Sequence, residues 1–206
     1  MKCIQYKYII SLIFIISFTI IRAQTRAKGN IVFAPVGMIN LALEKKMNNH
    51  FTLQEEIFIS PWKSFDNKYM QIYMGTLEGR YYFKENMYKW FLGVYGSVAR
   101  FNFERYWNKS VVLDENNVPV ILGDGSIRTS EIYHKGFTFI IGISGGYHFN
   151  FNEHWGTDIF LGFGSSQAIY KAYYKDNNDR SDKAEKWNKS GEFIPTRGGI
   201  MLTYKL

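Results

Sequence analysis

Hydrophobic and polar positions alternate along residues 136–164, where two long runs are separated by a short polar turn. A β-strand sends successive side chains to opposite faces, so alternation with a period of two predicts a strand between two different environments. In the first run, apolar positions alternate with small or polar ones: Phe137, Phe139, Ile141, Ile143, Gly145, Tyr147 and Phe149 against Thr138, Ile140, Gly142, Ser144, Gly146 and His148. The second run, from Trp155, alternates likewise, except that Phe160 falls among small or polar residues. The pattern predicts a β-hairpin.

The two faces and the turn of this hairpin are typical of a membrane barrel. One face is apolar, and the other is rich in Gly, Ser and Thr, as the interior of a tight barrel would be. Aromatic residues crowd the turn, at Tyr147, Phe149, Phe151 and Trp155. Because amphipathic rings favour the membrane–water boundary, this clustering predicts a transmembrane hairpin.

The rest of the chain repeats the pattern. The expected strands are 25–34, 38–46, 51–60, 69–83, 90–103, 136–149, 155–174 and 192–206. Short turns at 46–50, 84–88 and 150–154 alternate with longer loops at 61–68, 104–133 and 175–191, as short periplasmic turns and long extracellular loops do in outer-membrane barrels. We therefore predict an all-β fold, an eight-stranded antiparallel up-and-down transmembrane β-barrel of the outer-membrane type. The connection at 35–37 is very short for an outer loop, so the first strand is the least regular element.

The N-terminus has the features of a secretory signal peptide. Lys2 and Lys7 precede an apolar run at 9–21, which is short for a membrane helix, and a small residue, Ala23, offers a cleavage point. The sequence thus predicts a cleaved signal peptide at 1–23, export through the Sec route to the outer membrane, and a single barrel domain at 24–206. The alternative is an uncleaved N-terminal anchor.

Cysteine and charge exclude several classes of function. Cys3 is the only cysteine and lies in the predicted signal peptide, so a mature chain would have no disulfide, thiol catalysis or Cys-based metal site. The formal charge of +7 falls to +4 without Lys2, Lys7 and Arg22, and the remaining basic residues form no stripe. We expect no nucleic-acid partner, and we expect contact with outer-membrane lipid.

Five charged residues are expected to point into the barrel by alternation: Glu44, Glu78, Arg80, Asp158 and Arg197. Buried charges need partners, so these residues predict a lumenal network of ion pairs. The favoured interpretation is a packed polar core, because side chains fill the interior of eight-stranded barrels. The alternative is a narrow gated path or a small-ligand cavity.

Catalytic and metal chemistry find little support in the sequence. Residues 142–146 match the G-x-S-x-G pattern, but that motif requires a strand-to-helix turn and here lies within a strand. Ser144, His148 and an acid leave a lipid-modifying enzyme as an alternative. The histidines lack metal-ligand spacing, and the oxygen-rich segment 176–179 lacks the spacing of a calcium loop. We expect no enzymatic activity, no catalytic residues, no metal and no cofactor.

Several short motifs, in order, carry a family resemblance. They are Asn40-Leu-Ala-Leu-Glu44, Ser60-Pro-Trp62, Glu78-Gly-Arg-Tyr-Tyr82, Gly142 to Tyr147 followed by His154-Trp155, and Pro195-Thr-Arg-Gly-Gly-Ile200 closing on Tyr204. Together they resemble domain of unknown function 3575, a group of small Gram-negative outer-membrane β-barrel proteins. The resemblance covers nearly the whole mature chain and implies fold and location, without catalytic or ligand-binding residues to carry over.

The function we expect is that of a monomeric outer-membrane barrel with a structural role, or with an extracellular partner bound through the loops at 104–133 and 175–191. The alternatives are a narrow channel or small-ligand transport through the lumen, the lipid-modifying enzyme, and a soluble periplasmic barrel with a lipocalin-like cavity.

Overall fold

The computed structural model describes residues 24–63, 67–114, 118–181 and 187–206, with the side chains of 105–110 left aside. The predicted signal peptide at 1–23 lies outside the described residues. Within the described ranges no helix is long and apolar enough to cross a membrane.

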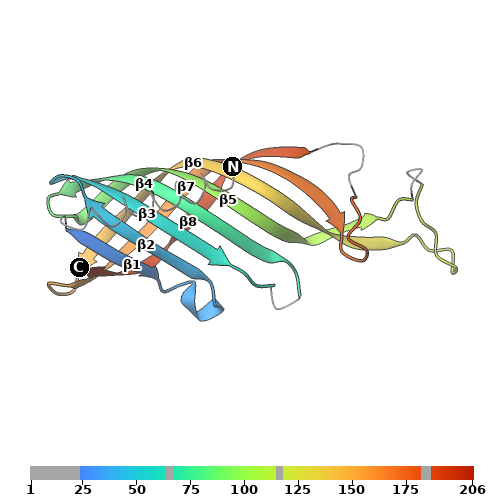
Figure 1. The fold of residues 1–206 in the computed structure, drawn as a ribbon, viewed down its shortest axis with the longest axis horizontal. Helices are drawn as coiled ribbons and strands as arrows, with labels where there is room; N and C mark the ends of the chain where they lie inside the picture. Colours follow the sequence, from blue (N-terminus) through green and yellow to red (C-terminus); the bar gives the residue numbers. More distant parts are fainter. Residues whose placement is uncertain (1–23, 64–66, 115–117, 182–186) are drawn as a thin grey trace, which may run out of the picture.

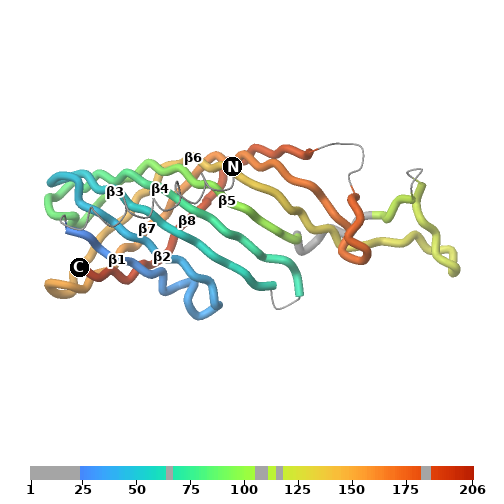
Figure 2. The backbone as a smooth tube through the Cα atoms, viewed as in Figure 1, coloured from blue at the N-terminus to red at the C-terminus, as the bar shows by residue number. Residues whose placement is uncertain are grey.

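Eight β-strands make up the described part of the chain (Figures 1 and 2). They are β1 (Thr25–Asn30), β2 (Ile39–Lys46), β3 (Phe51–Ser60), β4 (Met70–Lys84), β5 (Tyr88–Val111), β6 (Thr129–Asn150), β7 (Trp155–Tyr174) and β8 (Asn188–Lys205). One 3-10 turn, η1 (Ala34–Val36), connects β1 to β2. The all-β, antiparallel, up-and-down architecture that the alternation predicts is confirmed.

Each strand pairs with its neighbour in the chain, and β1 pairs with β8, so the sheet closes into a barrel. Short turns gather at one end together with the C-terminus, which we call the turn end (Figure 1). At the opposite end β5 and β6 run far past the other strands; we call this the extension end. The strands are unequal, from six residues in β1 to 24 in β5.

Burial alternates along the strands and assigns the two faces. In β2, Asn40, Ala42 and Glu44 are buried, whereas Ile39, Leu41 and Leu43 are exposed. The same inversion holds around the barrel, with polar and charged side chains inside and large apolar side chains outside. This polarity is the reverse of that in soluble proteins, which normally bury their apolar groups.

Glycines on β6 and β7 make room for aromatic rings inside the barrel. A β-carbon on Gly142 would overlap the Tyr95 ring, and one on Gly146 would lie 2.5 Å from Cζ of Phe91. The small inner face noted in the sequence is therefore the complement of the large inward side chains of β5.

Three predicted boundaries were wrong. The predicted strand at 25–34 ends at Asn30, and its connection to β2 occupies 31–38. Much of the predicted loop at 104–133 continues the β5–β6 ladder, with a register shift between Glu104 and Lys109, so the connection is only 112–128. The predicted loop at 175–191 is shortened to 175–187, because β8 begins at Asn188. At the start of β6 polar residues occur on both faces, at Ser130, Glu131, His134 and Lys135, so the sequence alternation does not mark a strand there.

The face assignment is tested by two adjacent glycines of β6. Gly146→Ala should destabilise the fold by about 1–3 kcal/mol, because the new methyl group would also lie 2.6 Å from the carbonyl oxygen of Ile159. Gly145→Ala should be neutral, since its nearest neighbour is Cδ2 of Leu92 at 3.4 Å. Urea titration followed by tryptophan fluorescence measures both, and equal effects would contradict the assigned register.

Candidate functional site

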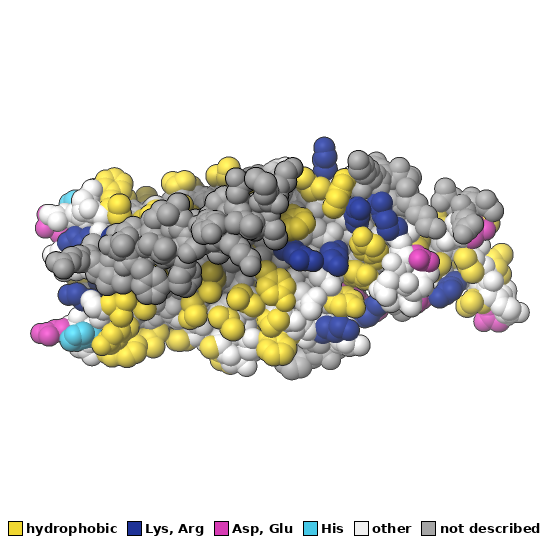
Figure 3. Space-filling view, viewed as in Figure 1, with side chains coloured by type: hydrophobic (Ala, Val, Ile, Leu, Met, Phe, Trp, Pro, Cys, Tyr) yellow, Lys and Arg dark blue, Asp and Glu magenta, His cyan; other side chains and the backbone are white. Residues whose placement is uncertain are grey.

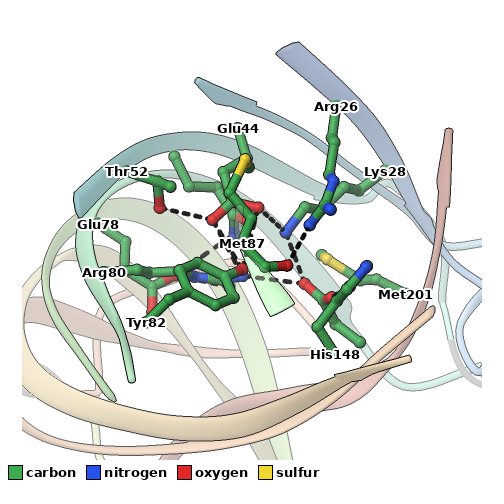
Figure 4. Close-up of polar contacts among 12 residues, drawn as sticks. Arg26, Lys28, Glu44, Thr52, Glu78, Arg80, Tyr82, Met87, His148 and Met201 are labelled. Carbon is green, nitrogen blue, oxygen red and sulfur yellow. Dashed lines mark hydrogen bonds and ion pairs between the residues drawn. The ribbon is translucent and has the colours of Figure 1, made fainter. Parts of the chain in front are cut away.

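The structure brings Glu44, Glu78, Arg80, Asp158 and Arg197 together inside the barrel (Figure 4 labels Glu44, Glu78 and Arg80). They come from β2, β4, β7 and β8, because inward positions at the same height on different strands converge on the axis. All five are buried. We call these residues and their ionic partners the charge cluster.

Lys28 of β1 lies at the centre of one half of the charge cluster. Its Nζ is 2.5 Å from Oε2 of Glu44 and 2.5 Å from Oδ2 of Asp158 (Figure 4). Arg80 reaches the same aspartate, with Nη1 3.0 Å from Oδ2. Glu44 also accepts hydrogen bonds from the hydroxyl groups of Thr52 and Tyr82. Lys28 thereby links β1 to its neighbour β2 and, on its other side, to β7, two strands away around the barrel.

Arg197 and Glu78 organise the other half. Nη1 of Arg197 is 2.8 Å from Oε2 of Glu78, and its Nη2 pairs with Glu56. Nη2 of Arg80 lies 2.9 Å from the same Glu78 oxygen, so this carboxylate joins the two halves. The Ser144 hydroxyl donates to Glu78. Each buried carboxylate thus has more than one positive or hydrogen-bonding neighbour, as its desolvation requires.

Phe160 explains the break in the alternation of β7. Its ring faces both guanidinium groups, with centroid distances of 5.8 Å to Cζ of Arg80 and 5.2 Å to Cζ of Arg197. Phe91 covers Arg80 at 4.3 Å, and Tyr95 covers Arg197 at 5.0 Å. These rings hold the arginines through cation–π contacts in a space that water would otherwise need to fill.

The charge cluster and the neighbouring Arg26, which is also buried, are together balanced in formal charge. Among the described residues they comprise four basic side chains and four acidic ones: Arg26, Lys28, Arg80 and Arg197 against Glu44, Glu56, Glu78 and Asp158. Arg26 donates from Nη1 to the backbone carbonyl of Met87 at the turn end. Such balance suits a filled lumen, because an unpaired charge in this space would be costly.

Sequence reasoning missed Arg26, Lys28 and Glu56. The alternation that marks an inward face was present in β1, where Arg26, Lys28 and Asn30 alternate with Thr25, Ala27 and Gly29. A short strand rich in basic residues nevertheless resembles a solvent-exposed segment. Glu56 was overlooked because it adjoins a second glutamate, Glu55, which points outward. Reading both faces of each short strand would have found them.

Ser144 and His148 do not form a nucleophile–base pair. The Ser144 hydroxyl contacts Glu78, whereas Nδ1 of His148 is 2.5 Å from Oδ1 of Asp158 and its Nε2 is 2.7 Å from Oδ1 of Asn150. Both ring nitrogens are engaged away from the serine. A hydrolase needs the base within hydrogen-bond reach of the nucleophile, so the geometry gives the enzyme alternative no support. In the part of the chain that is described, no group of His, Cys, Asp and Glu is arranged to hold a metal ion.

A second polar cluster lies at the extension end. Nζ of Lys175 is 3.1 Å from Oε1 of Glu104 and 2.9 Å from Oε2 of Glu131. Desolvation lowers the pKa of the Lys175 ammonium, but its hydrogen bonds to Glu131 and Glu104 outweigh this effect and raise the pKa above its ordinary value. Lys175 therefore stays charged and ties the connection after β7 to β5 and β6.

Removing one acid tests how tightly the charge cluster is coupled. Asp158→Asn should lower the free energy of unfolding by roughly 3–5 kcal/mol, because Lys28 and Arg80 would remain buried with less negative charge. The control Asp176→Asn, which affects a half-exposed contact with Arg128, should cost less than about 1 kcal/mol.

Urea titration measures both variants. Adding Lys28→Met to Asp158→Asn should restore part of the loss, since the pair is then removed together. Strictly additive losses would contradict a coupled cluster.

Comparison with known families confirms the family resemblance found in the sequence. No curated protein and no solved structure matches the chain. Residues 8–206 match the family described as Protein of unknown function (DUF3575), which is nearly the entire sequence. The chain, with its closed eight-stranded sheet and its internal charge cluster, therefore belongs to the DUF3575 family.

Proposed function

We propose that this protein is a monomeric integral barrel of a Gram-negative outer membrane, with a lumen closed by the charge cluster and an outer extension available to extracellular partners. Its role is structural or adhesive, without enzymatic activity. The observation that carries the proposal is the inverted polarity of the barrel, with paired charges inside and an apolar band outside.

The apolar band has the height of a bilayer core. On β5 the outward face is apolar between Trp90 and Arg100, ten residue steps or ~33 Å at about 3.3 Å per residue. A strand tilt of about 40° reduces this to ~25 Å, the height expected of a lipid-facing band. Figure 3 shows hydrophobic side chains over the middle of the barrel and charged ones toward its ends. Exposed members of the band include Leu41, Leu43, Ile57, Leu77, Leu92, Val94, Val98, Phe139, Ile141, Ile143, Ile159 and Leu161.

Aromatic rings border the band at the turn end. They include Phe51, Tyr81, Phe83, Trp90, Tyr147, Phe149, Trp155 and Tyr204. Trp90 and Tyr147 pack edge to face at a centroid distance of 5.0 Å. Such a girdle favours placing the turn end at the periplasmic interface.

Basic residues border the band at the extension end. Arg100, Lys135, Lys171 and Lys189 lie on the outward faces of β5 to β8, just beyond the last apolar residues. Lys135 and Lys171 are directly opposite each other in the sheet, a like-charge pair that is unfavourable without an anion nearby. Lipid phosphates at the outer interface would supply that anion.

The lumen supports a structural role over a conducting one. Arg80 of β4 crosses the interior to Asp158 of β7, and Arg197 of β8 crosses it to Glu56 of β3. Phe160 and Phe91 fill space beside these guanidinium groups. An ion would have to break several buried ion pairs to pass. Because eight-stranded barrels are filled by side chains, a permanent channel is disfavoured.

The outer extension offers an exposed apolar surface. Its tip folds back on itself, with backbone hydrogen bonds from Val112 N to Arg128 O and from Val120 N to Val112 O. Five exposed apolar side chains occupy the tip: Leu113, Val118, Ile121, Leu122 and Ile127. Exposed apolar groups on a rigid support favour a binding role.

The membrane proposal is tested by two exposed isoleucines. Ile143, 63% exposed, is the central outward residue of the apolar run of β6, and Ile121, 67% exposed, lies in the tip. In lipid, Ile143→Arg should cost about 2–4 kcal/mol of unfolding free energy, because an arginine side chain at the bilayer midplane is poorly solvated. Ile121→Arg should be neutral.

The measurement is urea unfolding in lipid vesicles, with boiled and unboiled gel mobility as the folding readout. A soluble barrel would tolerate both arginines equally and would show no heat-dependent mobility shift. That result would overturn the proposed membrane location.

We expect the barrel to fold without the tip of the extension. Val111 and Thr129 are paired in register, so Asn-Gly can replace 112–128 as a two-residue hairpin turn. The shortened protein should still fold, losing about 2 kcal/mol from the burial of Val112. Gel mobility and urea titration check this, and failure to fold would make the extension part of the barrel core.

A further inference from the structure

A cavity occupies the outer half of the lumen, on the extension side of the charge cluster. Its volume is about 430 Å³, within the range of roughly 300–1,000 Å³ typical of small-molecule sites. Apolar side chains form most of its wall, among them Phe58, Ile72, Met74, Phe101, Ile140 and Ala168. The lumen thus divides into a charged inner half and an apolar outer half.

The floor of the cavity is the upper edge of the charge cluster. Arg197 and Glu56 both line it, and their ion pair closes the passage toward the turn end. Asn40 donates from Nδ2 to Oε1 of Glu56 at 2.9 Å and completes this floor. Because Arg197 and Glu56 are already paired with each other, a ligand does not require a charged group at the floor. The apolar walls favour a hydrocarbon ligand.

The hydrogen-bonded wall of the barrel is incomplete beside this cavity. β8 pairs with β1 only over Met201–Lys205, and Ile31 adds one bond to the carbonyl of Ile200. Among the described residues, the outer half of β8 therefore has β7 on one side and no strand on the other. Pro195, which cannot donate a backbone hydrogen bond, lies in this free half, where a proline is tolerated.

Apolar groups line the gap. Ile194 pairs with Gly164 on the inward face, yet it is 40% exposed, which shows that the lumen is open beside it. Opposite, Phe33 in the β1–β2 connection packs on Phe58 with a ring distance of 5.3 Å and forms part of the cavity wall. Phe193, next to Ile194, points outward and is 72% exposed.

We propose that the cavity binds one acyl chain of a membrane lipid, which enters sideways between the outer half of β8 and the β1–β2 connection. The inference rests on the proposed membrane location, because only then does the gap face hydrocarbon. The narrow lumen suits a single linear chain, and the gap lets the chain enter while the lipid head group stays at the interface. A chain that fills the cavity gains dispersion contacts that the apolar walls otherwise lack.

The test uses the mature chain in nanodiscs of phosphatidylcholine that contain a phosphatidylethanolamine with a diazirine in its acyl chain. After irradiation, peptide mapping locates the adducts. Adducts are expected on outward residues of the band and also on inward cavity residues such as Met74 and Ile140. A second sample receives diazirine-labelled palmitic acid in solution instead.

Matched variants on adjacent residues separate the cavity from the surface. Ala168→Trp should reduce the inward adducts at least tenfold by filling the cavity, whereas Ile169→Trp on the outward face should leave them unchanged. If gel mobility shows that Ala168→Trp does not fold, a second pair of variants on β5 repeats the comparison. Ala99→Phe fills the cavity, and Val98→Phe is its outward control.

Inward adducts that respond only to the cavity variants support the proposal. Outward adducts without inward ones overturn it and leave the membrane location standing, whereas loss of all lipid adducts overturns the proposed function itself. Inward labelling by the free acid alone also overturns sideways entry of a lipid chain.

Discussion

A charge inside a closed eight-stranded sheet must find its partner among the side chains opposite, because the interior is too narrow to solvate it. This constraint sets the arrangement of the lumen. Glu78 joins Arg80 to Arg197, and Lys28 joins Glu44 to Asp158. The ring of Phe160 contacts both guanidinium groups. The glycines of β6 and β7 follow from the same requirement, since they leave space for the rings that pack on the arginines.

The sequence predicts these features unevenly, and the reason is physical. Alternation is enforced where a strand separates two different environments, so the strands of the barrel and the inward charges such as Glu44 and Asp158 were predictable. At the start of β6 polar residues occupy both faces, so the continued β5–β6 ladder resembled a loop. Lys28 was missed because its importance depends on Asp158, which is distant in the sequence and lies two strands away around the barrel. Pairing across a lumen is a tertiary property that no local pattern records.

The two halves of the lumen differ in the side chains that fill them. Near the turn end, paired charges and hydrogen bonds fix the strands to one another across the interior. On the extension side, apolar side chains surround a cavity that the chain itself leaves unfilled. The polar half supplies rigidity, and the apolar half can then remain open without collapse of the barrel.

The shortness of β1 also bears on how the barrel assembles. Its seam with β8 consists of five residue pairs, so it contributes fewer backbone hydrogen bonds than the seams between the long strands β5, β6 and β7. A seam this short is the natural last step of closure and the natural first place of opening. Lys28 sits on that strand and bonds to Asp158 of β7 and Glu44 of β2, on either side of the seam. The ion pairs of Lys28 thus hold the two sides of the seam together, as additional backbone hydrogen bonds would do in a longer ladder.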